Sequence, residues 1–146
     1  MIRPYMTEDA DALINLWRDA SAVAHPFLTP GFLDQEADNM RNIYLIHAET
    51  WVAEKDGSPV GFVALINSAD DTEIGGLFVA PNCHKQGFGR LLVDHARALK
   101  GPLDVEVFER NSVGRRFYDR YGFVEIARSF HDASQQATLK LRYVTT

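Results

Sequence analysis

Two closely spaced glycines, Gly87 and Gly89, stand between the apolar run Leu77–Pro81 and a segment with helical periodicity. This order predicts a strand, a tight turn and the start of a helix in direct succession. The first turn of a helix leaves backbone N–H groups without partners, and those groups carry partial positive charge. Because glycine has no Cβ, an anion can approach such groups closely. The stretch therefore allows two interpretations, a plain turn before a helix or a binding site for a phosphate or pyrophosphate.

Neighbouring residues narrow the kind of anion site. No Gly-Lys-Ser/Thr follows, so the loop is not a P-loop. Leu92 occupies the position at which a dinucleotide-binding fingerprint has its third glycine, so that pattern is not met either. His84, Lys85 and Arg90 add positive charge close to the turn.

Composition bounds the class of protein. The length of 146 residues suits one domain, expected to span 1–146. A net charge of −5 argues against nucleic acid as a partner, and the longest apolar runs, such as Val60–Ile66, are too short to cross a bilayer. The single cysteine, Cys83, excludes an internal disulfide and indicates a reducing, cytoplasmic location. Composition leaves monomer and homodimer open.

Helical and strand patterns alternate along the chain. The expected strands are Ile2–Arg3, Trp51–Glu54, Val60–Ile66, Glu73–Val79, Leu103–Phe108, Val124–Arg128 and Leu139–Tyr143. The first expected helix is capped by Thr7 and runs to about Ala22, and the second runs from about Pro30 to His47. The third runs from the glycine turn to Gly101, with Phe88, Leu91, Leu92, His95 and Leu99 at helical spacing, and the fourth from the cap Asn111 to Tyr121. Asp56-Gly57 marks a hairpin turn. The alternation predicts an α/β fold with one mixed sheet and helices on both of its faces.

Two segments resemble a known family. The stretch "LFVAPNCHKQGFGRLL" resembles the coenzyme A signature of the Gcn5-related N-acetyltransferase (GNAT) superfamily, in which Leu-x-Val-x-Pro leads into Arg/Gln-x-x-Gly-x-Gly/Ala. His84 stands where that family usually has Arg or Gln. Downstream, "NSVGRRFYDRYGF" (Asn111–Phe123) resembles the family's Asn-x5-Phe-Tyr-x3-Gly-Phe segment. The order of elements is similar along nearly the whole chain, and "AHPFL" and "HDASQQATLKLRY" resemble a group of small bacterial acetyltransferases.

The resemblance implies a fold and an activity. The sheet would be mostly antiparallel with about six or seven strands, and the Glu73–Val79 strand would splay away from the Leu103–Phe108 strand around acetyl-CoA. The implied activity moves an acetyl group from acetyl-CoA to a primary amine by direct attack in a ternary complex. Its acceptor is a protein lysine, a protein N-terminus or a small amine. The alternative is a non-catalytic acetyl-CoA or CoA-binding sensor or regulatory module.

The same resemblance assigns cosubstrate contacts. Those expected to bind acetyl-CoA are Leu77, Phe78, Val79, His84, Lys85, Gln86, Gly87, Phe88, Gly89, Arg90 and Asn111. A strand amide at Val79 would polarise the thioester carbonyl. Asn111 has two possible roles, helix cap and cosubstrate contact. The histidines lack metal-ligand spacing, so no metal is expected.

Four further residues are candidates for the chemistry and for the acceptor. Tyr118 matches the family's tyrosine beside the thioester sulfur, which suggests a general acid, although it could simply pack. Glu73 is the candidate base, acting through water, and shares a strand face with Val79 unless a bulge intervenes; the alternative is a solvated residue at the strand start. His25 and Phe27 fall in the region that covers the family's acceptor pocket, but a lone histidine is more often structural.

Overall fold

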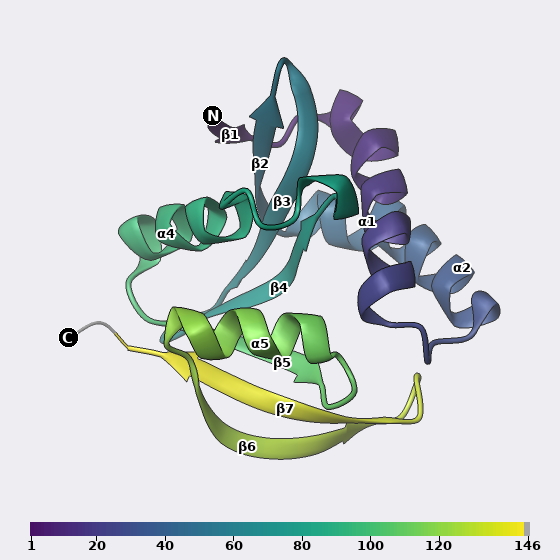
Figure 1. Ribbon diagram of the computed structural model, residues 1–146, viewed down its shortest axis with the longest axis vertical. Coiled ribbons are helices and arrows are strands. Elements are labelled where there is room, and N and C mark those ends of the chain that lie inside the picture. Colours follow the sequence, from purple (N-terminus) through teal and green to yellow (C-terminus); the bar gives the residue numbers. More distant parts are fainter. Residues whose placement is uncertain (145–146) are drawn as a thin grey trace.

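Seven strands form one sheet in the order β1-β2-β3-β4-β5-β7-β6 in the computed structural model, which describes residues 1–144 (Figure 1). The strands are β1 (Ile2–Pro4), β2 (Glu49–Lys55), β3 (Ser58–Asn67), β4 (Thr72–Val79), β5 (Leu103–Phe108), β6 (Val124–His131) and β7 (Gln136–Tyr143). The helices are α1 (Ala10–Ala24), α2 (Pro30–Asn39), α3 (Leu45–His47), α4 (Phe88–Lys100) and α5 (Ser112–Tyr121), with a π-helical turn, η2 (Met40–Tyr44), between α2 and α3. Among these strands only β4 and β5 pair in parallel, which confirms a mixed, mostly antiparallel sheet.

Helices cover both faces of the sheet, as the alternating pattern predicts. Helices α1 and α2 pack on one face, where Val52 and Phe62 point. Helices α4 and α5 pack on the other face, where Leu92 and Tyr118 meet Val63. Because strand side chains alternate between faces, one sheet serves two separate apolar layers.

The two predicted N-caps have different outcomes. Asn111 caps α5, since its Oδ1 accepts a hydrogen bond from the Gly114 amide at 2.8 Å. The prediction for Thr7 is wrong. A short 3-10 turn, η1 (Thr7–Asp9), precedes α1, and the carboxylate of Asp9 accepts from the Met6 amide at 2.9 Å. The Asp9 carboxylate at the third position of the turn thus satisfies the amide that precedes the turn, which is the reciprocal half of a capping box.

Helix α4 buries a narrower face than its apolar spacing suggests. Leu92, Val93 and Ala96 are fully buried, whereas Leu91 and Leu99 are each 49% exposed. A helix lying on a flat sheet contacts it over only part of its circumference, so the outer leucines stay in solvent.

Strands β4 and β5 are joined over only a short length. They pair at Glu73 with Asp104 and at Ile74 with Val105, and at no later position. The remaining residues of both strands diverge, as the resemblance implies. A V-shaped gap therefore opens in the middle of the sheet, between β4 and β5 (Figure 1).

A β-bulge at Gly75 changes which way β4 side chains point. The pairing with β3 jumps from Ile74 to Gly76 in one step, so Gly75 is the extra residue. Ile74 and Leu77 consequently pack on the same apolar layer, and Glu73 lies on the opposite face. The expectation that Glu73 shares a face with Leu77 and Val79 is corrected by the bulge.

Candidate active site

The loop between β4 and α4 presents a run of free backbone donors. The amides from Lys85 to Arg90 have no hydrogen-bond acceptor within residues 1–144. Lys85 (φ +65°) and Gly87 (φ +88°) adopt left-handed conformations, which turn successive N–H groups towards a common concavity. No atom lies within 4 Å of the place where a Cβ on Gly87 would stand. This geometry suits an anion at the start of α4.

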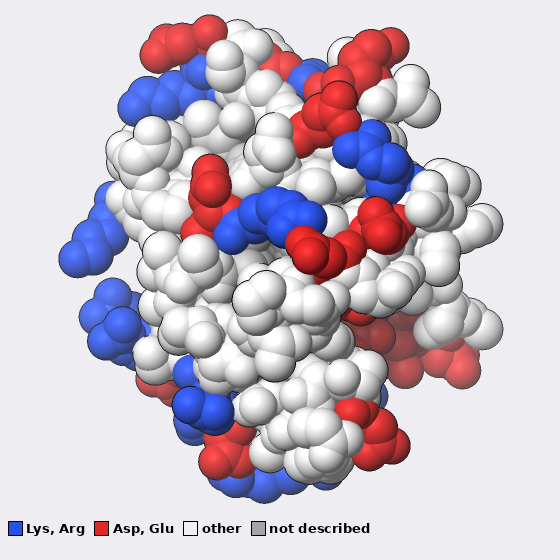
Figure 2. Space-filling view, turned by 90° about the vertical axis from the view of Figure 1, so that its right-hand side faces the viewer, with Lys and Arg blue, Asp and Glu red and all other residues white. Residues whose placement is uncertain are grey.

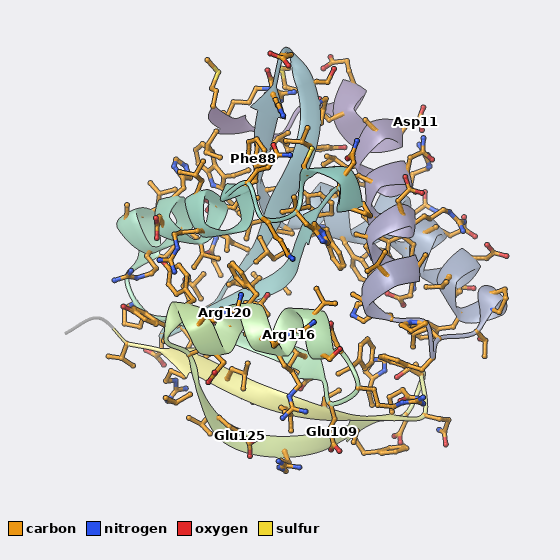
Figure 3. The ribbon with its side chains drawn as sticks, viewed as in Figure 1. Asp11, Phe88, Glu109, Arg116, Arg120 and Glu125 are labelled. Carbon is orange, nitrogen blue, oxygen red and sulfur yellow. The ribbon has the colours of Figure 1, made fainter. Side chains whose placement is uncertain are left out.

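Gly89 lacks a side chain for another reason. A Cβ at this position would lie 3.1 Å from Cε1 of Phe117, so glycine here lets α4 and α5 approach closely. Phe88, labelled in Figure 3 at the start of α4, packs its ring against the α4 and α5 layer. The loop therefore offers backbone amides rather than these side chains to a ligand.

Several side chains of the loop are bound within the protein. Nε2 of His84 lies 2.8 Å from the carbonyl oxygen of Val79, and a carbonyl only accepts, so His84 donates this bond. Gln86 accepts a hydrogen bond from Nζ of Lys55 at 2.9 Å. The guanidinium of Arg90 stands 4.9 Å from the centre of the Tyr121 ring. These contacts fix the shape of the loop and leave its amides as the anion-facing surface.

The backbone of β4 lines the V-shaped gap. Ala80 donates to the Val60 carbonyl at 2.8 Å, and Phe78, two residues earlier, also pairs with β3. Because strand residues alternate, the N–H and C=O groups of Leu77 and Val79 point away from β3, and of these the Val79 carbonyl already accepts from His84. Residues with cosubstrate roles predicted from sequence thus lie along one continuous path from β4 to the loop.

Tyr118 lies in the layer between the sheet and α5. It is only 5% exposed, and burial raises the pKa of its hydroxyl. Its ring packs against Phe117 and Phe123, with centroids 5.2 Å and 5.1 Å away. In the described chain the hydroxyl has no hydrogen-bond partner, whereas the hydroxyl of Tyr121 donates to Asp94. Tyr118 is therefore a neutral phenol whose hydroxyl proton is not hydrogen-bonded to any described residue.

Glu73 lies at the vertex of the gap, on the sheet face opposite α4. A pocket of about 180 Å³ is lined by Ile66, Ser68, Asp71, Glu73, Asp104 and Lys140. Burial raises the pKa of Glu73, and the carboxylates of Glu106 and Asp104 raise it further against the effect of Lys140. Asp104 is itself paired with Arg142 at 2.7 Å. A carboxylate with a raised pKa accepts a proton more readily, as a general base requires.

His25 spans the open end of the gap. Its ring lies 6.3 Å from that of Phe78 on β4 and 5.1 Å from that of Phe108 on β5, and Phe27 lies 5.8 Å away. Nδ2 of Asn111 lies 3.1 Å from its Nε2. Burial lowers the pKa of His25 to about 4, so the imidazole is neutral near pH 7. The structure brings both predicted acceptor residues together beside the gap.

Sequence reasoning missed Phe108 and the partner of His25. In the strand "LDVEVF", alternation places Phe108 on the same face as Asp104 and Glu106, away from the buried valines, and this signal was available. The contact between His25 and Asn111 joins residues 86 positions apart, and no local pattern predicts it.

Within residues 1–144, no three His, Cys, Asp or Glu side chains come together in a way that could hold a metal ion. None of the helices in that range has the length and apolar character needed to span a membrane. On the side of the molecule that α1 and α2 cover, acidic and basic side chains are interspersed (Figure 2).

Comparison with known proteins identifies the family. Residues 47–125, more than half of the chain, match the acetyltransferase (GNAT) domain. The chain is 28% identical over 138 residues to peptidyl-lysine N-acetyltransferase YiaC of Escherichia coli, covering 94% of this chain and 92% of that protein. The solution structure of apo-form YjaB from Escherichia coli superposes with a TM-score of 0.86 and 30% identity, covering 100% of this chain and 98% of that one.

A more distant structure shares the fold. The PaiA N-acetyltransferase from Thermoplasma acidophilum, in complex with coenzyme A, superposes with a TM-score of 0.79 and 20% identity over 98% of both chains. Together with the splayed strands and the amide-lined loop, the family match shows that this chain is an N-acetyltransferase of the GNAT family.

Proposed function

We propose that the protein transfers the acetyl group of acetyl-CoA to the primary amine of a protein lysine, a protein N-terminus or a small molecule, in a ternary complex. The observation that carries the proposal is the run of unpartnered amides from Lys85 to Arg90 beside the gap between β4 and β5. The coenzyme A held by PaiA and the peptidyl-lysine specificity in the name of YiaC support it. The lone cysteine fits a cytoplasmic location as part of the same proposal.

The described groups fit the parts of acetyl-CoA. The amides of the loop and of the first turn of α4 hold the pyrophosphate. The backbone of Leu77 and Val79 pairs with the amides of the pantetheine arm, and the N–H of Val79 donates to the thioester oxygen. Acetyl-CoA supplies the thioester, whose carbon bonds to the amine nitrogen while its bond to sulfur breaks. His84 holds the Val79 carbonyl and so orients the end of β4.

The reaction also needs two proton movements. A lysine-like amine with a pKa of roughly 10.4 costs about 4.6 kcal/mol to deprotonate at pH 7. Glu73, whose pKa is raised, accepts that proton through water in the pocket at the vertex of the gap. Tyr118 gives its proton to the departing sulfur, because its hydroxyl is neutral and has no partner among the described residues. The second proton of the amine nitrogen, released as the amide forms, restores the Tyr118 phenol.

Replacing the proposed acid tests this mechanism. Tyr118→Phe is expected to lower kcat by roughly 100-fold or more, because it removes the proton donor to the thiolate. The Kd for acetyl-CoA should change little, since the backbone contacts remain. Thiol release with a panel of amines measures kcat, and calorimetry measures Kd.

Tyr121→Phe is the matched control. Its hydroxyl donates to Asp94 and accepts from Arg97, so this change should lower stability and leave kcat nearly intact. If Tyr118→Phe abolished acetyl-CoA binding but kept turnover at saturation, the acid assignment would be wrong. Stoichiometric acetyl-CoA binding with no turnover on any amine would favour a sensor.

A further inference from the structure

Asn111 holds the ring of His25 in a defined orientation. Its Oδ1 accepts from the Gly114 amide at 2.8 Å, so the amide group cannot be turned the other way without losing the cap. Its NH2 group therefore faces Nε2 of His25, 3.1 Å away. Gly114 leaves room for this arrangement, because a Cβ there would lie 2.5 Å from Nδ2 of Asn111.

This contact decides where the imidazole proton lies. The NH2 group of Asn111 only donates, so Nε2 of His25 must accept and carries no hydrogen. The buried ring is neutral, and its one N–H is at Nδ1. Within residues 1–144 Nδ1 has no hydrogen-bond partner, and it is not among the fully buried polar atoms. The mostly buried ring thus keeps one accessible donor beside the gap.

The side chains that stack around His25 are aromatic. The rings of Phe27, Phe78 and Phe108 line the same space. The guanidinium of Arg110 already covers one face of Phe27, at 4.9 Å from the ring centre. Phe108 belongs to the sheet face that also carries Glu73, the proposed base. A ligand reaching this space meets these three aromatic rings and the Nδ1–H of His25.

We propose that the Nδ1–H of His25 binds a carbonyl oxygen of the acceptor, which makes the acceptor an amide-bearing amine such as a peptidyl lysine rather than a polyamine. This inference rests on the proposed acetyl transfer. A peptide offers carbonyl oxygens close to its amine, whereas a polyamine carries only ammonium groups, which donate. A site that hydrogen-bonds one substrate group rejects analogues that lack it. Asn111 is a positioning residue, and His25 is the group that contacts the acceptor.

Two acceptors of equal chain length test the inference. Nα-acetyl-lysine methylamide carries two amide carbonyls, and 1-pentylamine carries the same alkylamine without them. We expect kcat/KM to favour the amide by roughly tenfold or more in the unaltered protein. In His25→Phe, which keeps an aromatic ring and removes the donor, the preference should fall to about twofold or less. His47→Phe, the same change at an exposed histidine, should keep the full preference.

The outcomes separate the inference from the function on which it rests. Equal turnover of both acceptors, or an unchanged preference in His25→Phe with acetyl-CoA affinity retained, overturns the role of His25 alone. Absence of turnover on any amine overturns the proposed function. Nitrogen-15 spectra of the unaltered protein then decide the inference independently. The Nδ1 resonance of His25 should be that of a protonated nitrogen and should move when the lysine amide is added with CoA, and not when pentylamine is added. A proton on Nε2 instead would overturn it.

Discussion

His25 links the chemistry of a single residue to the stability of the fold. Burial holds its pKa at about 4, whereas an unfolded histidine has a pKa near 6.5. The unfolded chain therefore binds a proton at a pH where the folded chain does not. The stabilisation from the neutral ring is complete above about pH 6.5 and is lost as the pH falls towards 4.

The free energy of unfolding should accordingly fall by about 2 kcal/mol between pH 7.5 and pH 5, as urea denaturation measures. His25→Phe cannot take up a proton at this position, so this loss should be absent from the variant. Glu73, whose pKa is raised, adds a small change of the opposite sign in both proteins. The carboxyl groups with lowered pKa, those of Asp9, Glu49 and Asp104, titrate mainly below this window. An equal loss in His25→Phe would show that another group is responsible.

The sequence could predict which residues lie at the site better than it could predict the contacts that those residues make. Tyr118 was found from its place in a sequence pattern, but its uncommitted hydroxyl depends on packing that no pattern encodes. Asn111 was predicted as a cap because asparagine before a helix accepts from an amide two or three residues on. Its second bond, to His25, forms only when a loop between α1 and α2 meets the end of β5. Such contacts follow from topology and not from local sequence.

Helix α5 contains a glycine whose removal should have an unusual effect. In an exposed helix, Gly→Ala normally stabilises by about 1 kcal/mol, because alanine loses less backbone entropy. At Gly114 a Cβ would lie 2.5 Å from Nδ2 of Asn111. Gly114→Ala should therefore displace Asn111, weaken both the cap and the His25 contact, and destabilise by about 1 kcal/mol or more.

Gly31→Ala provides the control on another helix. Gly31 lies in the first turn of α2, and nothing stands within 4 Å of its Cβ position, so this change should be neutral or stabilising. The midpoints of urea denaturation, compared with that of the unaltered protein, show whether each substitution stabilises or destabilises the fold. If Gly114→Ala were as stable as Gly31→Ala, the Asn111 side chain would have room to move. The inference that Asn111 has one fixed orientation would then be wrong.

Element boundaries could be predicted where local signals are strong. Strand β5 is observed over the predicted Leu103–Phe108, because apolar alternation and the preceding Gly-Pro define it. Strands β6 and β7 extend beyond Val124–Arg128 and Leu139–Tyr143. The added part of β6 is exposed at the sheet edge and lacks an apolar period. The sequence allowed a bulge in β4 but did not place it at Gly75. A pair of glycines shows that the backbone can bend, and it does not show which residue leaves the pairing with the next strand.

The whole sheet consists of two parts that share little pairing. Strands β1 to β4 form one part and β5 to β7 the other, and they meet at two residue pairs of β4 and β5. The alternation of helices and strands predicted that helices cover both faces of this sheet. It did not predict that β7 lies between β5 and β6, because strand order depends on long-range pairing. Only the resemblance to a family implied the gap.

The proposed position of acetyl-CoA makes a prediction for amide exchange across this junction. The N–H groups of Leu77 and Val79 face the gap, whereas the N–H of Phe78 already bonds to β3. Acetyl-CoA should therefore slow exchange at Leu77 and Val79 by about tenfold or more, and leave Phe78 slow throughout. Residue-resolved hydrogen exchange by NMR, with and without acetyl-CoA, provides the measurement. If acetyl-CoA raised the melting temperature but left both gap-facing amides unchanged, it would bind elsewhere, and the pairing of β4 with the pantetheine arm would be wrong.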